Sequence, residues 1–172
     1  MGFLPRLGAT LDRLVETAGR LAGWIIFLLI GVTVFDVITR RFLVLGSTQL
    51  QELEWHFHAI LFFCCLGYAY LKGAHGRIEL FSQKFDEETR AWVEFLGGLF
   101  LILPFCGLLI WFGAEFVVDS WAEGERSASA TGLGHRWAIK LFLPLGISLL
   151  ALGVISAIIR NGIALLKFAG RD

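Results

Sequence analysis

Charged residues end the first long apolar run of the chain, in the stretch FDVITRRF. Asp36 and Arg40 are one helical turn apart, so their side chains can pair along one face of a helix. An acid in an apolar run is costly alone and is a functional candidate by default. The chemistry open to it is an ion pair, or the binding of a proton or cation. In the plainer alternative, Arg40 and Arg41 reach outward to water and Asp36 is neutralised locally.

Two further acids, Glu52 and Glu54, open the second apolar run in the stretch STQLQELEW. They follow shortly after the arginines of the first run, and burial near lipid favours the pairing of opposite charges. We therefore expect a structural charge cluster between the first two runs. Its members are Asp36, Arg40, Arg41, Glu52 and Glu54. A cation or proton site built from Asp36, Glu52 and Glu54 is the alternative.

The four histidines do not favour a haem or a metal centre. His56 and His58 are two residues apart, which separates them by roughly 200° of helix rotation. His75 and His135 lie outside the apolar runs, so no pair of deep histidines is left for haem. No cluster of metal-ligating residues is apparent either. We expect no cofactor, no metal and no catalytic residues.

The elements that must position these residues belong to a membrane protein. Of the 172 residues, 56% are hydrophobic and the mean hydropathy is +0.71, well above the values of an ordinary soluble domain. The formal net charge is zero, so no basic surplus attracts nucleic acid. The predicted fold class is an all-α integral membrane protein, and we expect no nucleic-acid partner.

Four runs are long and apolar enough to cross a membrane, at about 21–43, 50–71, 88–120 and 141–160. Short polar segments connect them, so residues 1–172 are expected to form one domain of four transmembrane helices. Before the first run, apolar residues recur at helical spacing from Phe3 to Ala18, which predicts an amphipathic helix on the inner membrane face. The third run is too long for a helix perpendicular to the membrane, and Pro104 with Gly107 offers a place to bend.

The distribution of Lys and Arg predicts how the spans are oriented. Ten of these residues lie before the first run, between the second and third, or after the fourth, and five lie in the other two connections. Because basic residues are enriched in cytoplasmic loops, both termini and the middle loop are expected to be cytoplasmic. The first and third connections then face outward.

The order of these motifs resembles that of a known family. FDVITRRF ends the first span, LQELEWHFHAI opens the second, HGRIEL follows it, and EGERSASATGLGHRWAIKLFLPLG leads into the fourth. This chain is similar to the small membrane (Q) subunit, DctQ, of tripartite ATP-independent periplasmic (TRAP) transporters. Asp36, Arg40 or Arg41, and Glu52 match charged positions of that family around the first two spans. His75, Arg77 and Glu79 match its histidine, basic and acidic positions in the cytoplasmic loop.

The resemblance implies a role in transport across the bacterial inner membrane. In such systems a soluble periplasmic protein binds an organic anion, often a carboxylate, and a large M subunit moves it inward with a sodium gradient. The Q subunit would be a scaffold for M that helps to dock the binding protein. The partners are then M, the binding protein and membrane lipid.

Two sets of loop residues receive roles from this resemblance. His75, Arg77 and Glu79 would anchor the cytoplasmic loop against lipid headgroups or M, with a solvated turn as the alternative. Arg126, His135 and Arg136 in the third connection are candidates for docking the binding protein, although Arg136 could simply anchor the fourth span at the headgroups.

Two readings from other classes stay open beside this one. The chain could be a self-sufficient small carrier that works as a homo-oligomer, with Asp36 or Glu52 as its proton or ion residue. It could also be a redox subunit, which the histidine spacing disfavours. The sequence does not name a transported substrate.

The predicted topology is testable with single cysteines at Ser82 and Ser129, in a background without native cysteines. Ser129→Cys is expected to react with a membrane-impermeant thiol reagent in intact cells, because its loop faces outward. Ser82→Cys should react only after the membrane is opened. Equal labelling of both positions in intact cells would contradict four spans with cytoplasmic termini.

Overall fold

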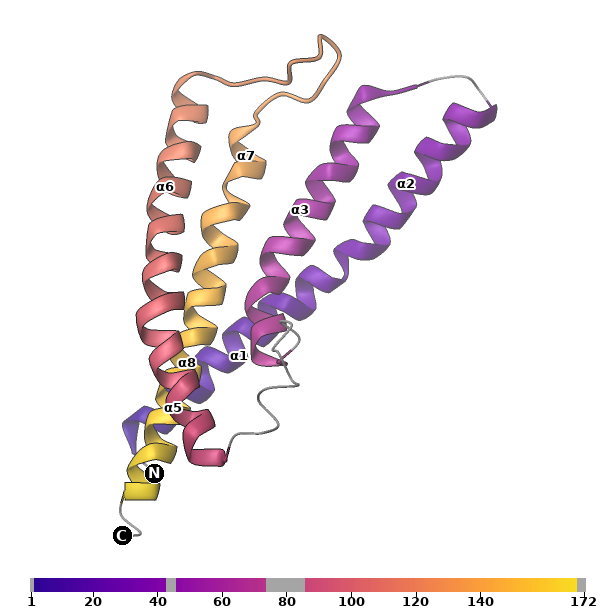
Figure 1. Ribbon diagram of the computed structural model, residues 1–172. Helices are drawn as coiled ribbons and strands as arrows, with labels where there is room; N and C mark the ends of the chain where they lie inside the picture. Colours follow the sequence, from indigo (N-terminus) through magenta and orange to yellow (C-terminus); the bar gives the residue numbers. More distant parts are fainter. Residues whose placement is uncertain (1, 43–45, 74–85, 170–172) are drawn as a thin grey trace.

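The computed structural model describes residues 2–42, 46–73 and 86–169, and these residues form helices and connecting segments without a strand. Figure 1 shows the helices as a bundle that opens toward one end. The elements are α1 (Phe3–Gly23), α2 (Ile25–Phe42), α3 (Thr48–Leu71), α5 (Glu87–Gly97), the π-helical turn η1 (Gly98–Ile102), α6 (Leu103–Ala122), α7 (Trp137–Lys140) and α8 (Phe142–Ala169).

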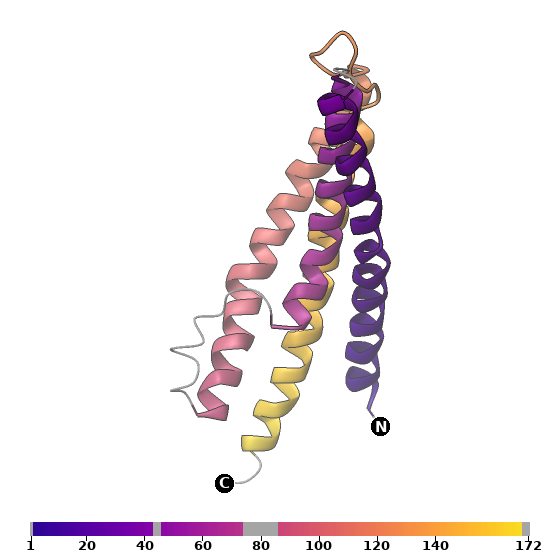
Figure 2. The ribbon, with the colours of Figure 1, turned by 90° about the vertical axis from the view of Figure 1, so that its right-hand side faces the viewer.

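The two ends of the bundle differ in what they carry. Both chain termini lie at the end where α5 begins, in both views (Figures 1 and 2). The opposite end carries the connection from α6 to α7, the start of α3 and the end of α2. We call the first the terminal end and the second the loop end. Termini that share one end fit an even number of crossings.

Three helical stretches are long and apolar enough to cross a membrane, Phe3–Phe42, Glu87–Ala122 and Trp137–Ala169. The sequence predicts four spans, and the structure confirms three of them as candidates. The remaining candidate, α3, has 24 residues, or about 36 Å of helix. Glu52, Glu54, His56 and His58 make its first half more polar than the other spans. A crossing by α3 stays a prediction.

The predicted amphipathic N-terminal helix is α1, but it is not a separate surface element. It runs into α2 with a single interruption at Trp24, whose N–H donates to the Leu21 carbonyl at 3.2 Å. α1 packs on α3 and α8 through a face of small residues, because Gly8, Val15, Gly19 and Ala22 are buried. Its larger apolar residues, such as Phe3 and Leu21, stay exposed.

The third run changes its helical form shortly before Pro104 and Gly107, the place where the sequence predicts a bend. α5 ends at Gly97, and the π-helical turn Gly98–Ile102 separates it from α6. Pro104 lies two residues after this turn, and its missing N–H leaves the carbonyl of Phe100 without its usual α-helical donor. A π-type turn accommodates this loss without ending the helix.

The core forms where helix backbones approach closely, with α8 at the centre. α8 contacts α3, α1, α5 and α6. A Cβ atom added at Gly67 of α3 would lie 2.6 Å from the Leu149 carbonyl oxygen of α8, and one at Gly146 of α8 would collide with the Phe63 carbonyl of α3. Val15 is fully buried beside Gly67, and Val154 of α8 is fully buried near Gly98. Small residues are typical of helix interfaces in membranes.

The Gly67 contact gives a stability prediction. Gly67→Ala should lower the thermal unfolding midpoint of the detergent-solubilised protein, because the new methyl group must push α3 away from α8, at a cost of ~1–3 kcal/mol. Gly107→Ala is the matched control, since a Cβ atom at Gly107 in α6 meets nothing within 4 Å. That control should leave the midpoint unchanged or raise it slightly. Equal effects of the two substitutions would show that the close contact does not limit stability.

Candidate functional site

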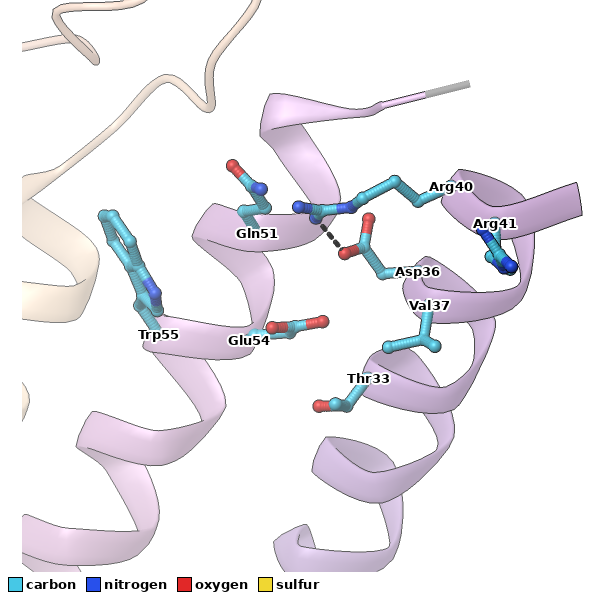
Figure 3. Close-up of a pocket in the computed structure, with 8 residues that line it drawn as sticks. All are labelled: Thr33, Asp36, Val37, Arg40, Arg41, Gln51, Glu54 and Trp55. Carbon is cyan, nitrogen blue, oxygen red and sulfur yellow. Dashed lines mark hydrogen bonds and ion pairs between the residues drawn. The ribbon is translucent and has the colours of Figure 1, made fainter. Parts of the chain in front are cut away.

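A polar cavity lies between α2 and α3 near the loop end (Figure 3). The two helices diverge toward this end in Figure 1, and polar side chains occupy the widening space between them. The cavity has a volume of about 570 Å³. Its lining residues are Thr33, Asp36, Val37, Arg40 and Arg41 of α2 with Gln51, Glu54 and Trp55 of α3.

Asp36 and Arg40 form the ion pair that their spacing predicts. A guanidinium nitrogen of Arg40 donates to Asp36 Oδ2. With the Gln51 amide oxygen turned toward it, Arg40 also donates to Gln51 from two nitrogens, at 2.8 and 2.6 Å. Arg40 thereby links α2 to α3. Asp36 is 3% exposed and is the only buried residue of α2.

Two carboxylate oxygens in this cavity lack hydrogen-bond partners within the described part of the chain. Asp36 Oδ1 is one, and Glu54 Oε1 is the other. Figure 3 shows the Glu54 carboxylate pointing from α3 toward α2 and the Thr33 hydroxyl pointing back toward α3. Arg41 is exposed, and no ion pair joins it to another described residue. The structure thus brings Glu54 and Arg41 to the same cavity as the Asp36–Arg40 pair.

Glu52 does not join this group and instead holds the connection between α6 and α7. It accepts hydrogen bonds from the Ser127 hydroxyl and, at 2.6 Å, from the Leu133 N–H. A Cβ atom at Gly132 would lie 2.7 Å from Glu52 Oε1, so this contact requires a residue without a side chain. The sequence predicts Glu52 in the charge cluster with Asp36, Arg40, Arg41 and Glu54, but its hydrogen-bond partners are Ser127 and Leu133. Its partners lie more than 70 residues further along the chain. The spacing of charged residues within the first two spans therefore does not predict them.

Glu125 provides the second attachment of this connection, which we call the outer loop (residues 123–136). Its carboxylate pairs with Lys140 and lies 4.0 Å from the Arg136 guanidinium. The bond from Lys140 is the largest cause that lowers the pKa of Glu125 below its usual value. The pair therefore persists at neutral pH and is lost only as the pH falls through that lowered pKa.

The residues predicted to dock a partner occupy this outer loop. Arg126 is exposed, and none of the described residues forms an ion pair with it. Arg136 is partly engaged by Glu125, and His135 has a positive φ of 58°, a conformation uncommon for residues other than glycine. Their role in docking stays a prediction.

The remaining predictions concern His75, Arg77 and Glu79, the other histidines, and the absence of a metal or cofactor. His75, Arg77 and Glu79 lie outside the described residues, so their anchoring role stays a prediction. His56 Nδ1 lies 2.5 Å from the Glu52 carbonyl oxygen within α3. In the ranges 2–42, 46–73 and 86–169, no three His, Cys, Asp or Glu side chains gather in a metal-binding group. The expected lack of a cofactor likewise stays a prediction.

These features define a class of protein: a helical membrane protein whose polar contacts concentrate near the helix ends. The chain matches the family described as the DctQ component of tripartite ATP-independent periplasmic transporters, over residues 29–162. It belongs to that family and is a small membrane subunit of a TRAP transporter. The matched region contains the whole cavity between α2 and α3, whereas α1 precedes it. A comparison with curated proteins gives no match.

A double-mutant cycle tests the Asp36–Arg40 pair. Arg40→Ala should reduce the yield of folded protein, because it leaves the buried Asp36 carboxylate without a counter-charge, a loss of about 3 kcal/mol at most. Asp36→Asn in the same chain should restore much of that loss, since the uncompensated charge is then gone. Yield and thermal midpoint of the two single variants and the double variant give the coupling. Simple addition of the two losses would contradict the pairing.

Proposed function

We propose that this chain is a scaffold subunit of a sodium-coupled TRAP transporter that imports an organic anion, with a carboxylate as the preferred class. It would lie beside the large M subunit in the bacterial inner membrane and help to dock the periplasmic binding protein. Membership of a tripartite family implies partners of this kind. Sodium coupling and the substrate class rest on the resemblance alone.

The observation that carries the scaffold role is the distribution of apolar and polar side chains. α2 and α6 expose large apolar side chains along most of their length, including Phe27, Phe35, Phe105 and Trp111. The buried polar or charged residues of the described chain are Asp36, Ser120 and Ser156. The first two lie toward the loop end, and Ser156 is bonded to the Gly8 carbonyl of α1 at 3.0 Å. This pattern supports packing against another membrane subunit and lipid rather than a polar route through the bundle.

The outer loop supports a docking role at the loop end. If the termini are cytoplasmic, as the Lys and Arg distribution predicts, this end faces the periplasm. Glu52 and Glu125 hold the loop against α3 and α7. It is therefore prepositioned and presents Arg126 to a soluble partner.

The second candidate is a self-sufficient homo-oligomeric carrier. The free Oδ1 of Asp36 is the observation that favours it, because an intramembrane carboxylate can bind a proton or cation. Glu52 is a poor second ion residue, since the outer loop already uses both of its oxygens.

Copurification and reconstitution separate the two candidates. A scaffold should copurify with a much larger multi-span subunit and should fail to transport alone in liposomes. A carrier should transport a substrate alone. Transport by this chain alone would overturn the scaffold proposal.

The docking role predicts a charge effect at Arg126. Arg126→Glu should raise, by several-fold, the concentration of binding protein needed for half-maximal transport in liposomes, and should alter its salt dependence, because exposed interface charges act mainly on encounter. Copurification with the large subunit should be unchanged. Arg136 is a less clean choice, since Arg136→Glu would place a second carboxylate beside Glu125.

Lys167→Glu is the matched control for Arg126→Glu. It makes the same charge change at an exposed residue near the other end of the bundle, late in α8. It should leave the dependence on binding protein unaffected. Identical curves for Arg126→Glu and the unmodified protein would remove this part of the loop from the docking surface.

A further inference from the structure

The cavity between α2 and α3 has more hydrogen-bond acceptors than donors. Asp36 Oδ1 and Glu54 Oε1 are buried and unpartnered within the described part of the chain. Buried polar groups are almost always hydrogen-bonded, because an unsatisfied group loses its hydrogen bonds to water and gains none in the protein. The Thr33 hydroxyl also faces the space between the helices (Figure 3). The cavity can therefore receive up to three hydrogen-bond donors.

The same cavity also carries positive charge. Arg40 is engaged by Asp36 and Gln51, whereas Arg41 is exposed on the cavity lining without an ion pair to any described residue. Counting Asp36, Glu54, Arg40 and Arg41, the lining has no net charge. A complementary ligand is then itself neutral overall but carries a cation and an anion.

The position of the cavity indicates a lipid. Trp55 on its lining is 68% exposed, and Trp and Arg side chains are typical of the headgroup level of a membrane. Ile30, Val34 and Val37 are exposed on α2 at spacings of four and three residues, so they form one apolar stripe that ends at the cavity. An acyl chain along this stripe would bring a headgroup to the polar residues.

We propose that this cavity binds the headgroup of a phospholipid with a primary ammonium group, that is, a phosphoethanolamine headgroup. The ammonium group has three N–H donors, which match Asp36 Oδ1, Glu54 Oε1 and the Thr33 hydroxyl. The phosphate would pair with Arg41, which also lines the cavity and for which an anionic oxygen is the natural partner. The volume of about 570 Å³ leaves room for such a group.

Other headgroups lack one half of this chemistry. A trimethylated ammonium group keeps the charge but has no N–H donor for the carboxylates. A phosphoglycerol headgroup has hydroxyl donors but no cation to face Asp36 and Glu54. A lysine from a neighbouring membrane helix would satisfy the carboxylates but leave Arg41 without an anion. This inference does not depend on the proposed scaffold role, because it concerns the chain itself.

Native mass spectrometry of the full-length protein, delipidated in detergent, tests the proposal. Phosphatidylethanolamine, its N-monomethyl and N,N-dimethyl derivatives, phosphatidylcholine and phosphatidylglycerol, all with the same acyl chains, are added at equal concentration. Retention should fall stepwise as N–H donors are replaced by methyl groups. We expect about tenfold between phosphatidylethanolamine and phosphatidylcholine, the factor that one charge-assisted hydrogen bond can supply.

Variants place the effect in this cavity. Glu54→Gln removes one carboxylate charge with little change of shape, and should reduce the tenfold preference to within about twofold. Glu123→Gln, at an exposed residue following α6, makes the same chemical change away from the cavity and should keep the full preference. The N-methyl series on the unmodified protein tests the proposal without either variant. The proposal can therefore still be contradicted if the Glu54→Gln protein folds poorly.

Three outcomes would overturn the proposal. They are equal retention of phosphatidylethanolamine and phosphatidylcholine by the unmodified protein, preferential retention of phosphatidylglycerol, and an unchanged preference in Glu54→Gln. In the copurified complex, loss of the preference only when the large subunit is present would identify a protein side chain as the occupant instead.

Discussion

Backbone contact between α3 and α8 is the constraint on which the rest of the bundle depends. Gly67 and Gly146 bring the main chain of each helix against a carbonyl of the other, which no residue with a Cβ atom permits. Without a hydrophobic drive between helices in lipid, such close packing is the principal source of attraction. α8 is fixed against α3 on one side, and it also contacts α1, α5 and α6.

Charged residues at the two ends of the bundle add polar contacts to the glycine-mediated packing in its middle. At the terminal end, Lys72 at the end of α3 pairs with Glu16 of α1, and Arg160 of α8 pairs with Asp12 of α1, both at 2.5 Å. At the loop end, Glu52 and Glu125 hold the outer loop. α1 is thus joined to α3 and α8 in two ways, by these ion pairs and by the packing of its small buried residues. The apolar middle of the bundle needs no polar contact of its own, because packing already determines it.

The sequence predicts well what depends on local spacing and poorly what depends on distant partners. Apolar runs predict the long helices, and a separation of four residues predicts the Asp36–Arg40 contact. Pro104 with Gly107 predicts a place to bend, and the π-helical turn lies just before it. Glu52 is assigned to the wrong neighbours because its partners, Ser127 and Leu133, are set by the fold of a distant loop. α1 resembles a lipid-facing helix because its packing residues belong to its apolar face. The recurrence of Gly8, Val15 and Ala22 every seven residues is the signal that could have indicated a helix partner.

α2 is the helix that this architecture holds least firmly, and this accounts for the position of the polar cavity. Among the described elements it packs mainly on α3 and to a small extent on α1, and its single buried residue is an acid. Apolar burial therefore contributes little to the position of its outer half, and the Arg40 link to Gln51 and Asp36 carries that attachment. Where two helices diverge and are joined by charges, open acceptor groups such as those of Asp36 and Glu54 can persist. A ligand that satisfied them would also fix the angle between α2 and α3.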